Sequence, residues 1–384
     1  MLLDLSVYLI VFAIALTMAF IYQKTYHDIH FHRISSVNNS LNVLVYLISG
    51  CIFLFPLIAM YGLRYGIGTD YFSYERIYTV IHNASFGEYW IGHINNAGEF
   101  YVEPGYYILN KIFLSYHSLK WGIGVLLFSL VLLAVKDYFY KISIPFALFI
   151  YLTTQYIYAM NVTRFAIALC FILVGYKELS KNKTVNFVIL VFLATLFHKS
   201  SFFCFPMYFL KQYKYKGVNS SRNLVLFISI ILFPLISSYL LRIIGKIPLF
   251  ERYFSVSHYS PSAAIGGGWS WILHILPVIL PLLILCKKEI FDSEDTSILF
   301  RICIMEVPFR MLGLYNTWYT RCSRFSQIAE VIFIPLVLSK IKNKRKRMLL
   351  YLYYFIWLIF YFAYYAIIND NGDSLPYSWI FSQL

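Results

Sequence analysis

Long apolar segments, separated by short polar connections, run through almost the whole sequence. The first is MLLDLSVYLIVFAIALTMAFIY at the N-terminus, and segments of similar character recur as far as residue 368. A helix needs about 20 apolar residues to cross the hydrocarbon core of a bilayer. Because backbone N–H and C=O groups cannot stay unpaired in lipid, each such segment must form a helix. The pattern therefore predicts an all-α, polytopic integral membrane protein.

Composition agrees with this prediction. Hydrophobic residues make up 60% of the chain, charged residues 13%, and the mean hydropathy is +0.66, whereas a soluble protein carries about 25% charged residues. Lipid must cover part of so much apolar surface. The net charge of +14 does not indicate a nucleic-acid partner, because Lys and Arg lie in short loops between apolar segments. That placement is typical of topology signals and of contacts with membrane lipid headgroups.

We expect about twelve transmembrane helices in a single transmembrane domain, residues 1–384. The N-terminal segment lacks a basic region and a small-residue cleavage site, so we expect it to be retained as the first helix. The arms 185–198 and 200–210 are short, and a hairpin or re-entrant element buried in protein is an alternative for them. The expected segments are 2–22, 42–62, 121–136, 143–160, 164–179, 185–198, 200–210, 222–244, 271–286, 297–315, 322–339 and 349–368.

The distribution of Lys and Arg predicts the orientation. If the loop KIKNKRKR at 340–347 is cytoplasmic, the loops on that side carry 20 of the 32 Lys and Arg residues. The positive-inside rule then places both chain ends outside. It also places the two longest connections, 63–120 and 245–270, on the external face. Pro104, which follows Glu103 in the first of them, suits a helix start.

A dense polar cluster, RYGIGTDYFSYER, follows the apolar segment 42–62. Gly66 and Gly68 permit a tight turn whose N–H groups can cradle an anion. Arg64 can donate paired hydrogen bonds to phosphate oxygens, and Asp70 can act as a base or orient a sugar hydroxyl. The alternative is a plain helix end, in which Arg64 anchors at the interface and Asp70 caps the helix.

Three further polar clusters lie on the same predicted side of the membrane. Arg164 of NVTR begins a helix, which makes it a candidate anion ligand, although a snorkelling arginine has the same pattern. His198 and Lys199 of FHKSS lie at the tip of the doubtful hairpin, where His198 is a proton carrier or a structural turn residue. Arg321 and Arg324 of WYTRCSR share one helix face and can grip a diphosphate together.

Glu306 and Arg310 lie four residues apart inside an expected transmembrane helix, and Glu330 lies inside the next. Since an ionised group at mid-membrane costs roughly 2.5–3.5 kcal/mol, we expect these residues to face the protein interior. We interpret Glu306 and Arg310 as a neutralising pair.

Together these clusters predict a basic pocket at the outer membrane surface that suits an anionic lipid headgroup, such as a lipid-linked diphosphate. We expect no metal and no cofactor, because the sequence has no ligand spacing typical of metal sites and no P-loop. The one histidine cluster, His27, His30 and His32, is cytoplasmic in this topology. The candidate acids and bases are Asp70, Glu103 and His198. The candidate diphosphate ligands are Arg64, Arg164, Lys199, Arg321 and Arg324.

The run LRYGIGTDYFSYERIY, followed by EPGYY at Glu103, resembles the EpsG family of Wzy-type polymerases of bacterial surface polysaccharide (O-antigen or capsule). NVTRFAIALCF around Arg164 and FLATLFHKSSFF around His198 are similar to the family too. YTRCSRFSQIAEVIFIP around Arg321 and Arg324, and LPY at 375–377, complete the resemblance, which spans nearly the whole chain in order.

The resemblance implies a metal-independent glycosyltransferase with a fold similar to the GT-C class. Its substrate would be an undecaprenyl-diphosphate-linked oligosaccharide at the periplasmic, extracytoplasmic face of the bacterial cytoplasmic (inner) membrane. The enzyme would transfer the growing glycan to the non-reducing end of a new lipid-linked unit. A chain-length regulator and a flippase are candidate partners.

Other functions fit parts of the pattern. A membrane ligase, which hands the glycan to a different acceptor, would use a similar pocket. A flippase for the lipid-linked unit needs charges spread through a cavity open to both sides, and here the charges cluster outside. An acyltransferase that draws on cytoplasmic acyl donors needs a site on that side, where the sequence offers only the histidine cluster.

Overall fold

The computed structural model describes residues 2–31, 36–212, 270–313, 317–368 and 374–380. Within these residues every regular element is a helix, and the only β pairing is an isolated bridge between Arg64 and Trp379. Among the described residues, four helices are long and apolar enough to cross a membrane: Leu5–Ile29, Tyr116–Tyr138, Tyr319–Lys340 and Lys344–Ala366. The chain is therefore an all-α protein with membrane-spanning helices, as the hydropathy pattern predicts. The expected segment 222–244 and the connection 245–270 lie outside the described residues.

The described residues form two compact units. Unit 1 comprises residues 1–174, 189–199 and 358–384, and unit 2 comprises residues 175–188 and 200–357. The elements that begin in unit 1 are α1 (Leu2–Phe31), α2 (Ser36–Leu63), α3 (Tyr71–Asn83), α4 (Phe86–Ile94), α5 (Pro104–Ile112), α6 (Tyr116–Val135), α7 (Ile144–Tyr151), α8 (Ile157–Asn161) and α9 (Thr163–Ser180). A π-helical turn, Leu152–Tyr156, joins α7 to α8.

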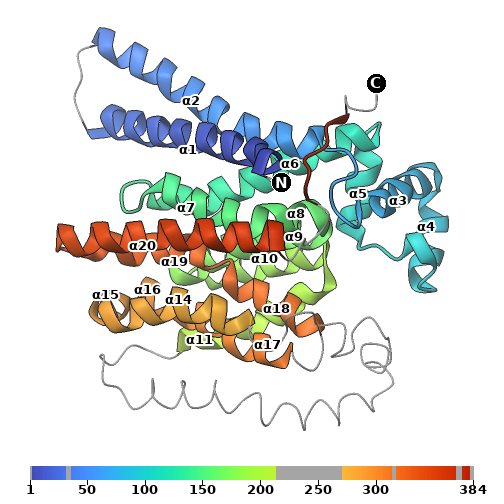
Figure 1. Cartoon of the computed structure of the whole chain (residues 1–384). Helices are drawn as coiled ribbons and strands as arrows, with labels where there is room; N and C mark the ends of the chain where they lie inside the picture. The colour runs from blue at the N-terminus through green and yellow to red at the C-terminus, as the bar shows by residue number, and fades with distance from the viewer. Residues whose placement is uncertain (1, 32–35, 213–269, 314–316, 369–373, 381–384) are drawn as a thin grey trace. The chain divides into compact units, whose positions relative to one another are not determined.

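Helices α1 and α2 of unit 1 pack along each other (Figure 1). The aromatic ring of Tyr22 in α1 lies 5.2 Å from that of Phe53 in α2. Helix α2 also packs on α6, and α1 on α7. The chain end returns to this unit, because Tyr8 donates a hydrogen bond to the carbonyl of Ser374 at 2.8 Å. The carbonyl of Ser378 accepts one from the backbone N–H of Tyr65 at 3.0 Å. This C-terminal segment therefore braces the loop that carries Arg64 to Asp70.

The connection 63–120 is folded rather than extended, since α3, α4 and α5 occupy most of it. One face of α3, formed by Tyr71, Tyr74, Tyr78 and Ile81, is buried, as the three- and four-residue spacing of a helix dictates. Helix α5 begins at Pro104, as predicted, because a proline at the first helical position loses no intrahelical hydrogen bond.

Unit 2 packs the later helices around an apolar interior. The Tyr354 hydroxyl donates to the carbonyl of Val278 at 2.7 Å and so joins α20 to α14. Arg301 Nη1 donates to the carbonyl of Leu210 at 3.0 Å and joins α16 to α11. The elements are η4 (Lys199–Tyr208), α11 (Phe209–Gln212), α14 (Ser270–Leu285), α15 (Lys287–Phe291), α16 (Glu294–Ile304), α17 (Glu306–Leu312), α18 (Thr317–Gln327), α19 (Glu330–Lys340) and α20 (Lys344–Ala363). Helix α10 (Thr184–Thr195) divides between the two units, as do the end of α9 and the end of α20.

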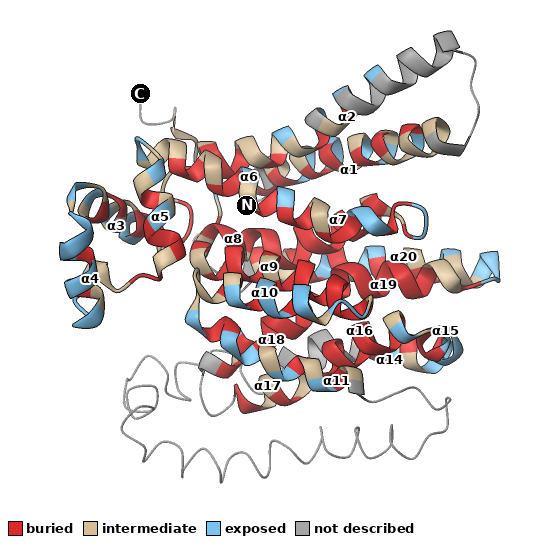
Figure 2. Cartoon of the chain, turned by 180° about the vertical axis from the view of Figure 1, so that it is seen from behind, coloured by how far each residue is buried: buried red, intermediate tan, exposed pale blue. Residues whose placement is uncertain are grey.

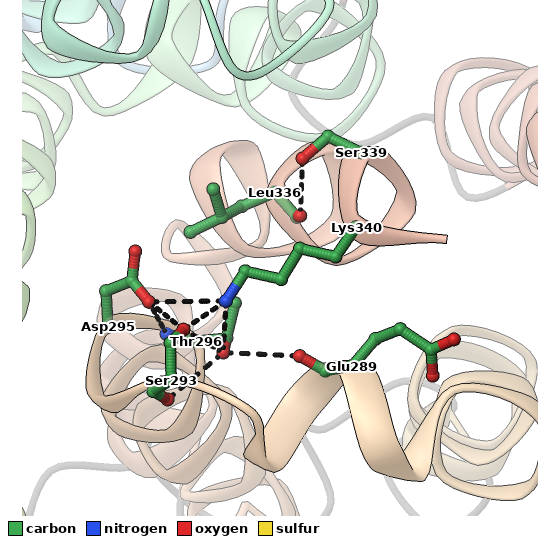
Figure 3. Close-up of polar contacts among 7 residues, drawn as sticks. All are labelled: Glu289, Ser293, Asp295, Thr296, Leu336, Ser339 and Lys340. Carbon is green, nitrogen blue, oxygen red and sulfur yellow. Dashed lines mark hydrogen bonds and ion pairs between the residues drawn. The ribbon is translucent and has the colours of Figure 1, made fainter. Parts of the chain in front are cut away.

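A polar cluster ties the end of α19 to the start of α16 (Figure 3). The ammonium of Lys340 lies 3.2 Å from Thr296 Oγ1 and 3.5 Å from an Asp295 carboxylate oxygen. It also donates to the Ser293 hydroxyl. Burial alone would raise the pKa of Asp295, but the Ser293 hydrogen bond and the Lys340 charge outweigh it and hold that pKa below its ordinary value.

The expected segment 200–210 differs from the prediction. It forms a 3₁₀ helix, Lys199–Tyr208, followed by the single turn α11. Pro206 lies inside this stretch and has no N–H for an α-helical hydrogen bond. The stretch is therefore too short and too irregular to cross a bilayer as a regular α-helix.

Candidate active site

The loop between α2 and α3 packs against the end of α8. Gly66 and Gly68 have positive φ angles of 65° and 101°, which glycine adopts without the steric cost of a side chain. A Cβ atom on Gly68 would lie 2.7 Å from the carbonyl oxygen of Met160. Asn161 Oδ1 accepts from the Thr69 hydroxyl at 2.7 Å and from the Asp70 backbone N–H at 3.2 Å. The glycines therefore let Asp70 lie beside the α8–α9 turn.

Asp70 occupies the N-cap position of α3, but its carboxylate makes no capping hydrogen bond. The simple capping role considered from sequence is therefore wrong. The side chain is half-buried, and its charge acts on Tyr74 one turn later. Burial raises the pKa of the Tyr74 hydroxyl, and the nearby Arg164 opposes that rise. The phenol thus stays neutral at physiological pH and can donate a hydrogen bond.

Arg164, the second residue of α9, forms an ion pair with Glu103, which immediately precedes α5. The Arg164 Nη1 atom lies 2.6 Å from Glu103 Oε2, and the exposed fractions of the two side chains are 24% and 8%. The guanidinium carbon lies 6.0 Å from the centre of the Tyr74 ring. Arg164 Nε has no hydrogen-bond partner. One side of the guanidinium is thus held by protein, while part of the side chain remains accessible.

The turn after α10 completes this group. Its Leu196 carbonyl accepts from the Gly105 N–H at 2.7 Å, and the Lys199 N–H donates to Glu103 Oε1 at 3.2 Å. The His198 ring meets the Phe165 ring edge to face at 5.0 Å. The Lys199 ammonium lies 4.3 Å above the Tyr101 ring, a favourable cation–π distance. Glu103 therefore joins three segments that are far apart in sequence.

The four residues Glu103, Arg164, His198 and Lys199 form one cluster, which we call the Glu103–Arg164 cluster. It lies within unit 1. The Arg164 side chain pairs with the Glu103 carboxylate, and the Lys199 ammonium over the Tyr101 ring adds a second positive charge. The local charge therefore favours an anion before His198 is counted. Sequence reasoning had placed these residues on one membrane face, and the structure adds the direct contacts.

Arg64 differs from the other candidate ligands because it is 2% exposed. Its guanidinium carbon lies 3.9 Å above the Tyr61 ring, and its Nη2 lies 3.4 Å from Thr163 Oγ1. Lys120 Nζ donates to the Arg64 carbonyl at 2.6 Å and to the Tyr71 hydroxyl at 3.0 Å. An anion reaches the Arg64 side chain only if this packing opens. The geometry therefore favours a supporting role for Arg64 inside the packed protein over direct contact with a diphosphate.

Sequence reasoning missed Tyr74, which lies beside Arg164, and also Lys120 and Asn161, which contact the loop that carries Arg64 and Asp70. Asn161 stands directly before the Val-Thr-Arg turn, and its amide is a common hydrogen-bonding group in turns. Lys120 looks like a membrane-boundary lysine in sequence, and only its contact with the Arg64 carbonyl reveals it. Tyr74 is one of 35 tyrosines, so composition could not single it out.

Arg321 and Arg324 belong to unit 2, on α18. Arg321 is exposed, while Arg324 is buried and its Nη1 lies 3.4 Å from Gln327 Oε1. Their place in a diphosphate site stays a prediction.

In the same unit, Arg310 Nε and a Glu306 carboxylate oxygen form a buried ion pair. That contact confirms the neutralising pair expected from sequence.

Among the residues that the structure describes, no three His, Cys, Asp or Glu side chains gather in a way that could hold a metal ion. His27 contacts the carbonyl of Phe139 through Nε2 at 3.1 Å. The side chains of His30 and His32 lie outside the described set.

Comparison with known proteins gives the family. The EpsG family model matches residues 47–379, which is far more than half of the chain. The protein belongs to the EpsG family. This is the family of Wzy-type polysaccharide polymerases, and the EpsG match takes in every candidate residue from Arg64 to Arg324. No curated protein and no solved structure matches the chain. EpsG membership indicates a polymerase-type role in surface glycan biosynthesis, with a lipid-linked saccharide in the membrane as substrate.

Proposed function

We propose that this EpsG protein polymerises undecaprenyl-diphosphate-linked oligosaccharide repeat units at the outer face of the bacterial cytoplasmic membrane. It transfers the growing glycan from its lipid carrier to the non-reducing end of a new lipid-linked unit. We propose about twelve membrane segments in a GT-C-like architecture, with the irregular stretch 200–210 among them, and the Glu103–Arg164 cluster on the outer side.

One observation carries this proposal: the Arg164 side chain is partly exposed while Glu103 holds one side of its guanidinium, and the other oxygen of Glu103 fixes the Lys199 backbone N–H beside it. A partly exposed guanidinium held on one side by Glu103 can donate its remaining N–H groups to diphosphate oxygens. Lys199 adds a second positive charge from the adjoining turn. The start of α9 contributes the positive end of a helix dipole.

The proposed reaction exchanges one bond at the anomeric carbon of the growing glycan. The bond from that carbon to the diphosphate oxygen breaks, and the diphosphate leaves with the electron pair. An acceptor hydroxyl of the new unit forms the glycosidic bond and gives its proton to a base. Arg164 and Lys199 stabilise the charge that develops on the leaving diphosphate. In enzymes such stabilisation contributes about 2.7–4 kcal/mol for each well-placed donor.

The contacts of Glu103 distinguish it from the other two candidate bases, His198 and Asp70. Both carboxylate oxygens of Glu103 are engaged, one by Arg164 and one by the Lys199 N–H. An acceptor hydroxyl would have to compete with these two hydrogen-bond donors to reach the carboxylate. Glu103 therefore suits a positioning role, and His198 and Asp70 are the proposed bases. Arg321 and Arg324 stay proposed as diphosphate ligands on the sequence pattern alone.

The size profile of surface glycan from a strain that lacks this gene, compared with the complemented strain, tests the proposal. A polymerase predicts that the ladder collapses to a single repeat unit and that complementation restores it. Three outcomes would contradict it. Full-length polymer that lacks only a decoration indicates a side-chain transferase. Lipid-linked units held on the cytoplasmic face indicate a flippase, and full-length polymer left on its lipid carrier indicates a ligase.

A further inference from the structure

Helix α4 carries a stripe of exposed apolar side chains. Phe86, Trp90, Ile91 and Ile94 are 65%, 47%, 62% and 60% exposed. Their spacing of three and four residues places them on one side of the helix. Helix α4 shows large exposed areas in Figure 2. Isolated apolar side chains on a surface are ordinary, but four on a nine-residue helix form a patch.

The opposite side of α4 fixes the orientation of this stripe. The Tyr89 ring stacks on the Tyr107 ring of α5 with 3.8 Å between their centres, and the Tyr89 hydroxyl donates to the Val102 carbonyl at 2.9 Å. A Cβ atom on Gly92 would collide with the Phe100 side chain at 2.7 Å. The N-terminus of the helix is fixed by a capping box between Ser85 and Glu88. The stripe is therefore held outward by the packing of α4 on α5.

The membrane lies close to α4 along the chain. Helix α5 ends at Ile112, and the candidate membrane span begins at Tyr116. Between them Leu114 is 89% exposed, and on α5 itself Ile108 and Ile112 are 54% and 62% exposed. Apolar surface thus continues from the spanning helix onto α5, the helix on which α4 packs.

We propose that α4 is an interfacial helix that inserts Phe86, Trp90, Ile91 and Ile94 into the headgroup and upper acyl region of the bilayer. Tryptophan favours that depth, and aliphatic side chains gain from contact with acyl chains. A saccharide site needs polar side chains beside its aromatic ring. Here Glu88 serves the capping box, and the His93 ring stacks on Tyr89. This inference needs only a membrane-spanning α6, so it does not depend on the proposed enzymatic function.

The proposed contact between α4 and the bilayer also affects the Glu103–Arg164 cluster. Tyr107, on which Tyr89 stacks, lies one turn after Glu103. A bilayer that holds α4 therefore also limits the movement of the start of α5. The Glu103 carboxylate then stays near headgroup level, the depth at which a lipid-linked diphosphate lies.

Site-specific fluorescence on the full-length protein in lipid nanodiscs tests the inference. Ile91→Cys is labelled with bimane, and Asn83→Cys, an exposed polar position at the end of α3, is the matched control. Wild-type protein labelled in parallel measures the contribution of native cysteines. We expect blue-shifted emission at position 91, with spin-labelled lipid quenching it several times more strongly than at position 83. Iodide in the water should show the reverse order.

Equal quenching of both positions by iodide, with no effect of spin-labelled lipid at position 91, would overturn the inference. So would shielding of position 91 that appears only when a soluble saccharide or a partner protein is added. If Ile91→Cys lowers the yield of folded protein, Ile94→Cys on the same stripe is measured with the same expected result.

Discussion

The Nη1 atom of Arg164 lies 2.6 Å from Oε2 of Glu103, although 61 residues of chain separate the two side chains. The contact joins the start of α9 to the start of α5. The other oxygen of the same carboxylate accepts from the Lys199 N–H. A single acidic side chain therefore organises the cluster in which we place diphosphate binding.

Replacing Glu103 by Gln tests its positioning role. The amide keeps the size of the side chain and an oxygen for the Lys199 N–H, but it leaves the Arg164 charge without compensation. Breaking a fully buried pair costs about 3–5 kcal/mol. We expect roughly 2 kcal/mol here, because Arg164 is partly exposed. The melting temperature in detergent should fall, and glycan extension should decrease without a change in its pH profile.

Glu99→Gln is the matched control, because Glu99 pairs with the exposed Arg76 at 2.8 Å in the same connection, 63–120. It should leave stability and extension unchanged. If Glu103 is instead the base, Glu103→Gln will abolish extension altogether, even at temperatures where the variant stays folded.

Gly68→Ala probes the loop that places Asp70. The backbone there has a φ angle of 101°, and the added methyl would meet the Met160 carbonyl oxygen at 2.7 Å. We expect a loss of about 1–3 kcal/mol of stability from backbone strain, with loss of glycan extension. Gly87→Ala on α4 is the control, since its Cβ would have only the Ser85 hydroxyl within reach, at 4.0 Å. Unchanged extension in Gly68→Ala would show that the loop does not support the site.

The Lys340–Asp295 contact predicts a dependence of stability on pH. The folded pKa of Asp295 lies below its ordinary value. Its contribution is therefore complete above the unfolded pKa of about 3.9 and disappears as pH falls through the folded pKa. In Asp295→Asn the melting temperature near pH 7 should drop by an amount equivalent to about 1 kcal/mol. The difference from wild type should shrink below pH 4. A constant difference from pH 7 to pH 3 would contradict this account.

The hydropathy pattern predicted much of this architecture because an apolar segment that crosses lipid must form a helix. The start of α5 at Pro104 and the short turn before Arg164 followed from local signals of the same kind. The fold of 63–120 did not, since α3, α4 and α5 are stabilised by tyrosine contacts such as Tyr89 on Tyr107, which depend on tertiary packing. The membrane side of Glu103, Arg164 and His198 stays a prediction, and the burial of Arg64 depends on contacts that sequence does not show.

Cysteine accessibility tests the proposed topology. Ser73→Cys lies in the exposed part of α3, and Lys344→Cys lies at the start of α20. A membrane-impermeant maleimide added to intact cells should label position 73 alone, while position 344 should react only after the cells are opened. Wild-type cells provide the background from native cysteines. Labelling of both positions from the same side would contradict the placement of the Glu103–Arg164 cluster on the outer face.

The most direct test of the central claim is the length of surface glycan made by Arg164→Ala in a strain that lacks the native gene. Arg76→Ala is the matched control, because Arg76 is an arginine on α3 whose side chain is 70% exposed. At equal amounts of folded protein, Arg164→Ala should yield single repeat units, and Arg76→Ala should restore the full ladder. A full ladder from well-expressed Arg164→Ala would contradict the assignment of this guanidinium to the diphosphate.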